Sequence, residues 1–407
     1  MDIRNTILIT SFVLSGISLF RYLIYLFLSP LYTFQKIKIL KKIKSISKVE
    51  VEKKLKVSVI VPAWNEEVGI ADAITSLLQN SYNNLEIIVV NDGSVDKTDT
   101  AVKKYYEKNI RNKNLYGKSF IYINKKKNAG KGAAINSGIK QSSGDLIVTM
   151  DADTRFEKDA IYNAARYFLD KDIDAGVGNV KIANSKNILG IIQQIEYTIG
   201  FYFKRCHSVL NCEYIIGGAF GIFRKEIFEK CGFFDEKNKT EDIEFSTRLK
   251  SFGLKTIFIE DAIAYTEGPS TFEGLLKQRS RWKKGRMDTF LRYSNLFFSN
   301  NKNHNFFLSW ILLPIALIGD LDLILFPILT PFIFYYTFES LDYNYWIGWI
   351  IFFTFSIIFS YLFGSRKNNI RSFLLIPVFY FASYLLIFTE IYAIIHSVIL
   401  YLKRLII

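Results

Sequence analysis

The sequence predicts an α/β fold with flanking transmembrane helices, and three observations support this prediction. Residues 56 to about 290 alternate short apolar, β-branched runs with longer polar-patterned segments, which is typical of buried parallel strands joined by helices. Long apolar segments lie on both sides of this region. The formal net charge is +14, and the basic residues cluster beside the apolar segments, which favours an anionic membrane surface over nucleic acid.

The first apolar segment, Ile7 to Leu28, is about as long as a membrane is thick, and Arg21 is its only charge. It lacks the short apolar core and the small-residue cleavage site of a signal peptide, so we interpret it as an uncleaved transmembrane helix. A lysine-rich stretch follows, and the positive-inside rule places it and the next domain in the cytosol.

The C-terminal part is apolar again from about Phe306. The segment 305–338 is interrupted at Gly319-Asp320-Leu321-Asp322, where we expect an interface helix followed by one spanning helix, or two short elements. Further spans are predicted at 345–363 and 373–402, joined by a basic loop at 364–371 that we place in the cytosol. The expected parts are a transmembrane helix at 1–30, a basic linker at 31–55, a cytosolic domain at 56–295, and an interface helix with C-terminal transmembrane helices at 296–407.

Within the middle domain, four apolar runs are predicted to be strands, and each ends in turn or acidic residues. These runs are 57–61, 87–90, 120–123 and 146–150. A helix-like pattern follows each of them, so ligands are expected at the carboxyl ends of the strands. The three cysteines (Cys206, Cys212 and Cys231) include no Cys-x-x-Cys pair, which fits a reducing compartment without a disulfide framework.

Polar motifs follow the first two predicted strands: Pro62-Ala63-Trp64-Asn65-Glu66-Glu67 and Asn91-Asp92-Gly93-Ser94. A carboxylate at a strand end can accept hydrogen bonds from a base or a ribose, and Gly93 would let the backbone approach a ligand. An ordinary turn is the alternative. The motif Asn128-Ala129-Gly130-Lys131-Gly132 opens a predicted helix to about Ser142, and its lysine and free N–H groups suit a phosphate, with a solvated lysine as the alternative.

Acidic residues follow the fourth predicted strand and begin a later helix. Asp151 and Asp153, at i and i+2 beyond the strand, can hold a divalent cation against a diphosphate, or can cap the next helix. Thr240-Glu241-Asp242 opens a helical pattern from Asp242 to Phe252. This motif is either an N-cap with first-turn acids or a general base at a helix start.

The last motif is Gln278-Arg279-Ser280-Arg281-Trp282, in a strongly basic segment. On a helix Gln278, Arg281 and Trp282 share a face. Arginine and glutamine can bind phosphate oxygens and tryptophan can stack on a sugar. The alternative is a juxtamembrane amphipathic helix with its tryptophan at the membrane interface.

Taken together, in this order, the motifs resemble the inverting family-2 glycosyltransferases of the membrane-embedded polysaccharide synthase type, which include poly-N-acetylglucosamine, chitin and hyaluronan synthases. The resemblance runs from about Val57 to Arg286 and implies a GT-A-type, Rossmann-like domain. It implies the following roles: Asp242 as catalytic base; Pro62, Asn65, Glu66, Asp92, Lys131, Asp151, Gln278 and Arg281 at the nucleotide-sugar; Gly217, Gly218 and Trp282 at the acceptor; and Asp153 at a Mg²⁺ or Mn²⁺ ion.

The resemblance implies transfer from a UDP-sugar, first of all UDP-N-acetylglucosamine, to a growing β-linked polysaccharide with inversion. The apolar segments on both sides of the domain indicate that the polymer is exported as it grows. Asp320, Asp322 and Glu390 are candidates for lining an export path, with an interfacial position as the alternative. We expect a multi-pass protein of the cell membrane whose partners are the UDP-sugar donor, a glycan or lipid acceptor and the membrane, without nucleic acid; accessory subunits would be additional. The alternatives are a single-addition glycolipid synthase and a transporter with a degenerate nucleotide-sensing domain, although the intact acids argue against the transporter.

Overall fold

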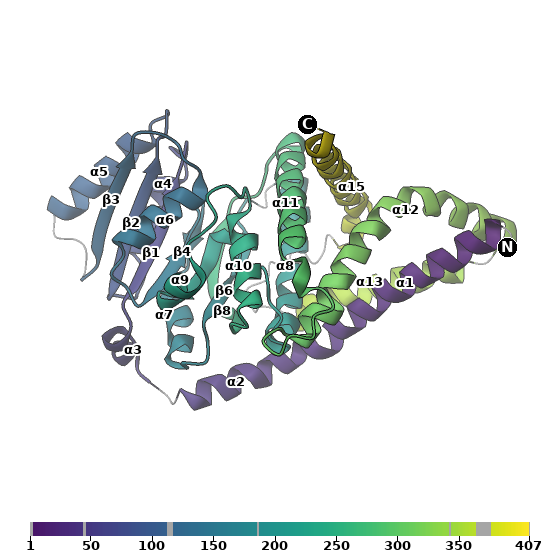
Figure 1. Ribbon diagram of the computed structural model, residues 1–407, viewed down its shortest axis with the longest axis horizontal. Coiled ribbons are helices and arrows are strands. Elements are labelled where there is room, and N and C mark those ends of the chain that lie inside the picture. The colour runs from purple at the N-terminus through teal and green to yellow at the C-terminus, as the bar shows by residue number, and fades with distance from the viewer. Residues whose placement is uncertain are drawn as a thin grey trace. The chain divides into compact units, whose positions relative to one another are not determined.

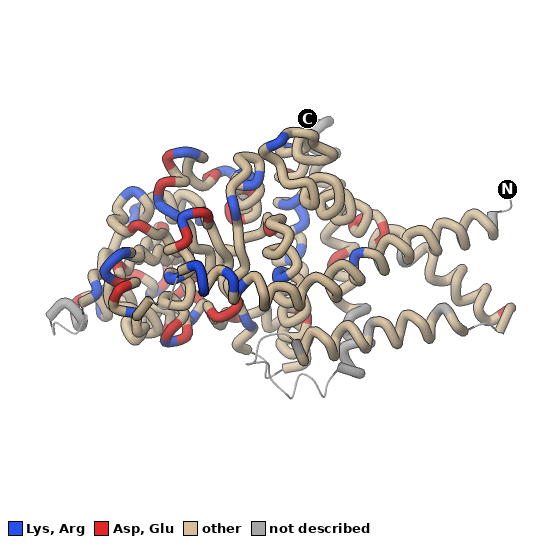
Figure 2. The backbone as a smooth tube through the Cα atoms, turned by 90° about the horizontal axis from the view of Figure 1, so that it is seen from below, with Lys and Arg blue, Asp and Glu red and all other residues tan. Residues whose placement is uncertain are grey.

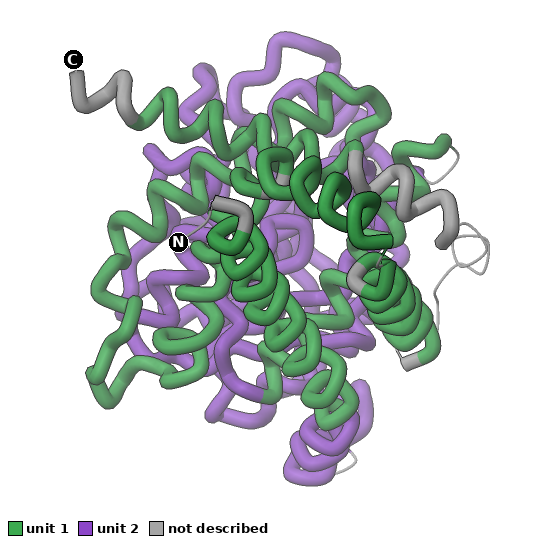
Figure 3. Tube along the Cα trace, turned by 90° about the vertical axis from the view of Figure 1, so that its right-hand side faces the viewer, with its two compact units in different colours: residues 1–32, 186–209, 269–407 green, residues 33–185, 210–268 purple. Residues whose placement is uncertain are grey.

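The computed structural model describes residues 3–43, 46–111, 117–184, 187–341, 343–363 and 376–406, and the chain forms two compact units (Figure 3). The helical unit comprises Met1–Tyr32, Lys186–Val209 and Pro269–Ile407. The sheet unit comprises Thr33–Ser185 and Leu210–Gly268. The domain boundaries predicted from the sequence remain predictions.

The sheet unit is built on one eight-stranded sheet with the strand order β3-β2-β1-β4-β7-β6-β8-β5 (Figure 1). The strands are β1 (Val57–Ala63), β2 (Leu85–Asp92), β3 (Ser119–Lys125), β4 (Leu146–Thr149), β5 (Arg155–Phe156), β6 (Ala175–Ile182), β7 (Gly221–Arg224) and β8 (Thr256–Thr266). The first four confirm the strands predicted from apolar runs. They pair in parallel, and every residue of β2 and β4 is buried.

Beyond these four strands, for which alone the sequence predicts parallel pairing, β6 and β8 also pair in parallel, but other pairs do not. β7 pairs antiparallel with both β4 and β6, and β5 pairs antiparallel with β8, so the sheet is mixed. β5 and β7 are too short, at two and four residues, to give an alternation pattern. In β6 two glycines, Gly176 and Gly178, interrupt the β-branched composition that would predict a strand. Glycine is needed at position 178, because a side chain there would collide with the ring of Phe220.

The helices of the sheet unit are α3 (Lys48–Lys54), α4 (Ile70–Leu78), α5 (Thr98–Arg111), α6 (Lys131–Gln141), α7 (Ala160–Ala165), α9 (Glu226–Cys231) and α10 (Glu241–Ser251), together with α2 (Tyr32–Lys42) from Thr33 onward. Most of these helices lie between strands in the sequence, whereas α2 and α3 precede the first strand. α6 packs on β1 and β2, α7 packs on β8, and α4 contacts α5 (Figure 1). The helices predicted from about residue 130 to 142 and from 242 to 252 correspond to α6 and α10.

The helical unit contains α1 (Ile3–Leu28), α8 (Ile188–Val209), α11 (Phe272–Arg292), α12 (Leu313–Ser340), α13 (Asn344–Phe363) and α15 (Ile376–Ile406). Among the described residues, Asn5–Lys42 and Leu308–Leu325 are long and apolar enough to cross a membrane, and Trp346–Leu362 and Leu385–Tyr401 are shorter apolar helices. Figure 2 shows long stretches of α1 and α12 without charged residues.

The break that the sequence predicts at Gly319-Asp320-Leu321-Asp322 is absent, because α12 continues through these residues for 28 residues. Both acids have partners within the helical unit. Asp320 pairs with Lys283 at 3.0 Å and with Arg286, and Asp322 accepts a hydrogen bond from Ser18 at 3.3 Å. Because partners within the helical unit satisfy both acids, the helix does not have to end at these residues. The predicted basic loop at 364–371 lies outside the described residues.

Candidate active site

The candidate site lies at the carboxyl ends of β1, β2 and β4. These three strands are parallel, so the loops that follow them emerge at one edge of the sheet. β1 lies between β2 and β4, so β2 and β3 follow on one side of β1 and β4 begins the other side of the sheet. Crevices at such a switch point are where open α/β sheets bind ligands. The structure therefore brings together the motifs that the sequence predicts after the first, second and fourth strands.

Asn65 joins the loops that follow β1 and β2. Its backbone is in the left-handed region, with φ of 56°, and its N–H donates to Ser94 Oγ at 3.0 Å. Its side-chain Oδ1 accepts from the N–H of Val95 at 3.0 Å, and the N–H of Glu66 donates to Thr98 Oγ1 at 2.8 Å. Pro62 lies just before this loop, on β1 opposite Val90. Asn65 thus holds together the two loops at which the sequence predicts nucleotide binding.

Asp92 is buried at the end of β2, and its carboxylate has partners within the protein. It accepts from Lys125 Nζ at 2.5 Å and from the N–H groups of Ala129 at 3.0 Å and Gly130 at 2.8 Å. Gly93 has φ of 68°, and a Cβ there would lie 2.6 Å from the backbone N of Asn128. The close approach that Gly93 permits is therefore to the chain itself, whereas the sequence predicts an approach to a ligand.

Glu66, Asp151 and Asp153 form an acidic cluster after β1 and β4. Burial, followed by the charges of Asp153 and Asp151, raises the pKa of Glu66 to about 7. Burial and the charge of Asp151 raise the pKa of Asp153 to about 6. Asp153 Oδ1 accepts hydrogen bonds from Thr266 Oγ1 at 3.1 Å and Thr154 Oγ1 at 3.3 Å, which orient this carboxylate.

Lys131 begins α6 and forms ion pairs with Asp151 Oδ1 at 2.6 Å and Glu241 Oε1 at 3.4 Å. Burial alone would lower the pKa of Lys131, but the charges of Asp151, Glu241 and Asp242 raise it above its ordinary value. The lysine therefore stays charged and connects the acidic cluster to the first turn of α10. A permanent positive charge at this helix N-terminus suits a phosphate group.

Asp242 lies in the first turn of α10, and two backbone N–H groups hold its carboxylate. Gly218 N–H donates to Oδ2 at 3.0 Å, and Ile243 N–H donates to Oδ1 at 2.9 Å. A Cβ on Gly218 would lie 2.7 Å from Lys131 Nζ, so Gly218 packs directly against the lysine. Nothing lies within 4 Å of a Cβ on Gly217. The structure thus brings Gly218, Lys131, Asp151 and Asp242 together.

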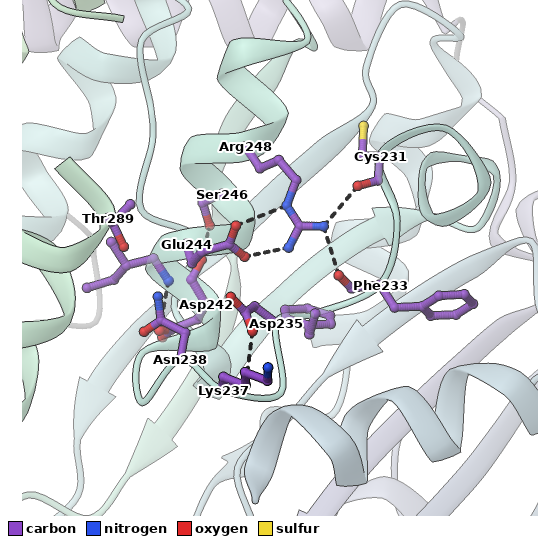
Figure 4. Close-up of polar contacts among 12 residues, drawn as sticks. Cys231, Phe233, Asp235, Lys237, Asn238, Asp242, Glu244, Ser246, Arg248 and Thr289 are labelled. Atoms are coloured by element: carbon purple, nitrogen blue, oxygen red, sulfur yellow. Dashed lines mark hydrogen bonds and ion pairs between the residues drawn. The ribbon is translucent and has the colours of Figure 1, made fainter. Parts of the chain in front are cut away.

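The loop at 232–240 joins α9 to α10, and Arg248 holds the start of this loop in place (Figure 4). The guanidinium pairs with Glu244 and donates to the carbonyl oxygens of Cys231 at 2.9 Å and Phe233 at 2.8 Å. Thr240 is the N-cap residue of α10, as the sequence predicts, but its side chain makes no capping bond and instead donates to Asn238 Oδ1 at 3.2 Å. Arg248 therefore fixes the approach of the chain to Asp242.

Gln278, Arg281 and Trp282 lie on α11 in the helical unit, three and four residues apart as the sequence requires. Arg281 is exposed, whereas Gln278 and Trp282 are half-buried. Their predicted contacts with the diphosphate and the acceptor remain predictions.

Sequence reasoning missed several residues that the structure places at the site. Glu241 pairs with Lys131, and Thr266 and Arg248 hold Asp153 and the loop before α10. Glu241 directly precedes Asp242 in the motif Thr240-Glu241-Asp242, and this adjacency in the sequence indicates that Glu241 also lies at the site. Thr266 belongs to no motif because its partner Asp153 is distant in sequence, and Arg248 holds the loop through backbone carbonyl oxygens, which leave no sequence signal.

The acidic cluster fits a divalent cation that shares its coordination with a diphosphate. Within the described ranges, no group of three or more His, Cys, Asp or Glu side chains is arranged to hold a metal ion by itself, so further ligands would have to come from a substrate or water. Mg²⁺ commonly takes one or two protein carboxylates and completes its shell with water and substrate phosphates. The charges of Glu66, Asp151 and Asp153 act on one another at this edge of the sheet, and a cation held among these carboxylates would neutralise part of their negative charge.

Comparisons with known proteins show the family and the fold of this chain. The family model described as Glycosyl transferase family 2 matches residues 58–232, and that of Glycosyl transferase family group 2 matches residues 146–402. A poly-beta-1,6-N-acetyl-D-glucosamine synthase of Staphylococcus aureus is 35% identical over 253 residues, covering 61% of this chain and 58% of the relative. The corresponding Staphylococcus epidermidis synthase is 33% identical over 238 residues, or 58% of this chain and 56% of the relative.

The matched region thus spans less than two thirds of either synthase. Among solved structures, a Pyrobaculum calidifontis mannosyltransferase in complex with GDP-Man and Mn²⁺ has a TM-score of 0.54 and 18% identity. That match covers 86% of this chain and 98% of the mannosyltransferase chain. At this identity the likeness concerns the fold, and it agrees with the GT-A type that the motifs predict.

Proposed function

Because this chain belongs to glycosyltransferase family 2, we propose that it transfers N-acetylglucosamine from UDP-N-acetylglucosamine to a growing β-linked polysaccharide with inversion. The observation that carries the proposal is the set of charged residues around Lys131, which pairs with Asp151 and lies beside Gly218, the donor to Asp242. The two Staphylococcus synthases support the choice of sugar and of a polymeric product.

In this proposal the donor nucleotide lies over the ends of β1 and β2. Pro62, Asn65 and Glu66 shape the pocket, and Asp92 contacts the uridine. Because internal partners occupy much of the Asp92 carboxylate, we expect it to act by holding the loop at Ala129 and Gly130 as well. Lys131 then exchanges one of its carboxylate partners for the diphosphate.

Asp242 acts as the general base. It removes the proton from an acceptor hydroxyl as that oxygen attacks the anomeric carbon, while the bond from this carbon to the diphosphate oxygen breaks and UDP departs. The negative charge that develops on the diphosphate is stabilised by Lys131, Gln278 and Arg281. Attack opposite to the leaving group converts an α-linked donor into a β-linked product, without a covalent enzyme intermediate.

A divalent cation, Mg²⁺ or Mn²⁺, would be held by Asp153, with Asp151 beside it, and would supply charge neutralisation for the departing diphosphate. The acceptor glycan would lie against Gly217, Gly218 and Trp282. We further propose a multi-pass protein of the cell membrane with a cytosolic sheet unit, in which the polymer is exported as it grows. The apolar helices α1 and α12 support membrane insertion.

The test is to incubate the purified full chain in lipid nanodiscs with a panel of radiolabelled UDP-sugars and Mg²⁺ or Mn²⁺, and to size the product. We expect a ladder or high polymer from UDP-N-acetylglucosamine, cut by an enzyme specific for poly-β-1,6-N-acetylglucosamine. A single lipid-linked sugar would replace the polymerase proposal with glycolipid synthesis. No turnover of any donor would overturn the proposed activity.

A further inference from the structure

A layer of charged side chains, centred on one buried arginine, joins three helices of the helical unit. Arg279 on α11 has a side chain that is only 5% exposed, and it pairs with Glu196 of α8 at 2.6 Å and with Glu390 of α15 at 3.6 Å. Glu390 also pairs with Lys283, one turn farther along α11, at 2.7 Å. The acid within the last predicted span therefore contacts α11, the helix that carries Gln278, Arg281 and Trp282.

An apolar layer lies one helical turn before this charged layer. Ile192 of α8, Leu275 of α11 and Leu386 of α15 form a buried cluster, with Leu189 packed against it. Each of these three residues stands four positions before a member of the charged layer, namely Glu196, Arg279 and Glu390. Residues four apart lie on the same helix face, so the apolar cluster and the ion pairs fix the same three-helix junction.

The guanidinium of Arg279 lies over the ring of Trp282, with 4.7 Å from its central carbon to the ring centroid. A planar guanidinium can stack on an aromatic face while its N–H groups donate to carboxylates, which a lysine ammonium cannot reproduce. Two glutamates from other helices thus set the position of the guanidinium, and the guanidinium in turn supports one face of Trp282. A ring fixed in this way is pre-organised for stacking on a sugar.

We propose that Arg279 is a positioning residue that fixes the Trp282 ring for the acceptor sugar, and that Glu390 of α15 holds Arg279 in place. This inference rests on the proposed function, in which Trp282 contacts the acceptor. It also assigns Glu390 a role other than lining an export path: the C-terminal helix α15 sets the acceptor-binding surface of α11.

The test compares Arg279→Lys, Arg279→Gln and Glu390→Gln with the parent protein, all as full chains in nanodiscs. Lys277→Gln is the matched control, because Lys277 is an exposed cation on the same helix that pairs only with Glu273 among the described residues. Polymer extension is measured against the concentration of a short β-linked N-acetylglucosamine acceptor, and UDP binding is measured by calorimetry. A second readout is the Trp282 fluorescence, obtained as the difference between each protein and its Trp282→Phe derivative.

We expect Arg279→Lys to raise the acceptor KM about tenfold and to shift the Trp282 difference spectrum, with UDP affinity unchanged. Glu390→Gln should change both readouts in the same direction, and by less, because its contact with Arg279 is longer. The proposal would be overturned if Arg279→Lys had the same acceptor KM and the same Trp282 difference spectrum as the parent. If that variant does not fold, an unchanged spectrum in Glu390→Gln would overturn it.

Failure of the proposed function gives a different result. A parent protein that turns over no UDP-sugar would refute the function, while the Trp282 difference spectrum would still report whether Arg279 and Glu390 fix the ring. A raised acceptor KM in Lys277→Gln equal to that in Arg279→Lys would also overturn the proposal, because it would show a general effect of charge on α11.

Discussion

The backbone N–H of Gly218 donates a hydrogen bond to Oδ2 of Asp242 over 3.0 Å. The other carboxylate oxygen, Oδ1, accepts from the N–H of Ile243 at 2.9 Å. Both donors are backbone groups, so side-chain rotamers at Gly218 and Ile243 do not alter them. The orientation of the proposed base is therefore built into the fold before any substrate binds.

Replacing Asp242 with Asn should abolish the base while preserving this geometry, because the amide oxygen can still accept one of the two hydrogen bonds. We expect kcat for polymer extension to fall by about 10²- to 10⁴-fold, the usual contribution of a general base. UDP affinity, measured by calorimetry, should stay within about twofold of the parent, which corresponds to less than 1 kcal/mol. Extension at the parental rate by Asp242→Asn would refute the assignment of Asp242.

Replacing Gly218 with Ala should reduce activity much more than stability. The new Cβ would lie 2.7 Å from Lys131 Nζ, the end of a flexible side chain that can move at little cost to the fold. Moving it breaks the pair with Asp151, so kcat/KM should fall about tenfold, or roughly 1.4 kcal/mol. The matched control is Gly200→Ala, at an exposed position on α8 with no proposed role in the site, since a Cβ there has open space. Equal losses in the two variants would contradict this explanation.

Asp153→Asn should remove most of the dependence on a divalent cation. The parent should bind UDP more tightly in the presence of Mn²⁺ than in EDTA, and the variant should bind it equally in both. We expect its kcat/KM to be at least about 100-fold lower, as for the loss of a cation that stabilises a leaving group. Asp172→Asn, an exposed acid that pairs with Lys42, is the control. A variant that keeps the Mn²⁺ effect would place the cation elsewhere.

The parallel strands and their motifs could be predicted from the sequence because they are local signals. Apolar runs such as 57–61 and 146–150 are long enough to specify buried strands, and Asp92, Lys131 and Asp151 follow strands or open helices. Parallel pairing then places these loops at one edge of the sheet. That part of the site follows from the alternation of elements along the chain.

The remaining features depend on contacts between distant residues. The helix through Asp320 could not be predicted, because the cations that pair with the acid, Lys283 and Arg286, lie in another helix. Likewise the sequence predicts that Asp92 binds a ligand. Only the structure shows that its carboxylate accepts hydrogen bonds from Lys125 and from the backbone after Asn128. Local sequence patterns do not encode which partner reaches a side chain.

Lys250 provides a prediction for stability. It is buried in α10 and donates to uncharged acceptors: Leu254 O at 2.8 Å, Asn211 Oδ1 at 3.2 Å and Thr256 Oγ1 at 3.3 Å. Burial lowers the pKa of Lys250 to about 8. The unfolded chain keeps the proton up to about pH 10.4. Between these values the unfolded state binds more protons than the folded state, so the free energy of unfolding should rise with pH.

The free energy of unfolding should rise by roughly 3 kcal/mol between pH 8 and about pH 10.4, if the full difference between the folded and unfolded pKa of Lys250 contributes. Chemical unfolding of the purified protein, followed by circular dichroism at several pH values, measures it. Lys250→Met removes the titrating group, so its curve should lack this rise, whereas Lys230→Met, at an exposed site on α9, should keep it. A rise that persists unchanged in Lys250→Met would mean that another group is responsible. A parent curve that is flat above pH 8 would mean that Lys250 stays protonated inside the fold.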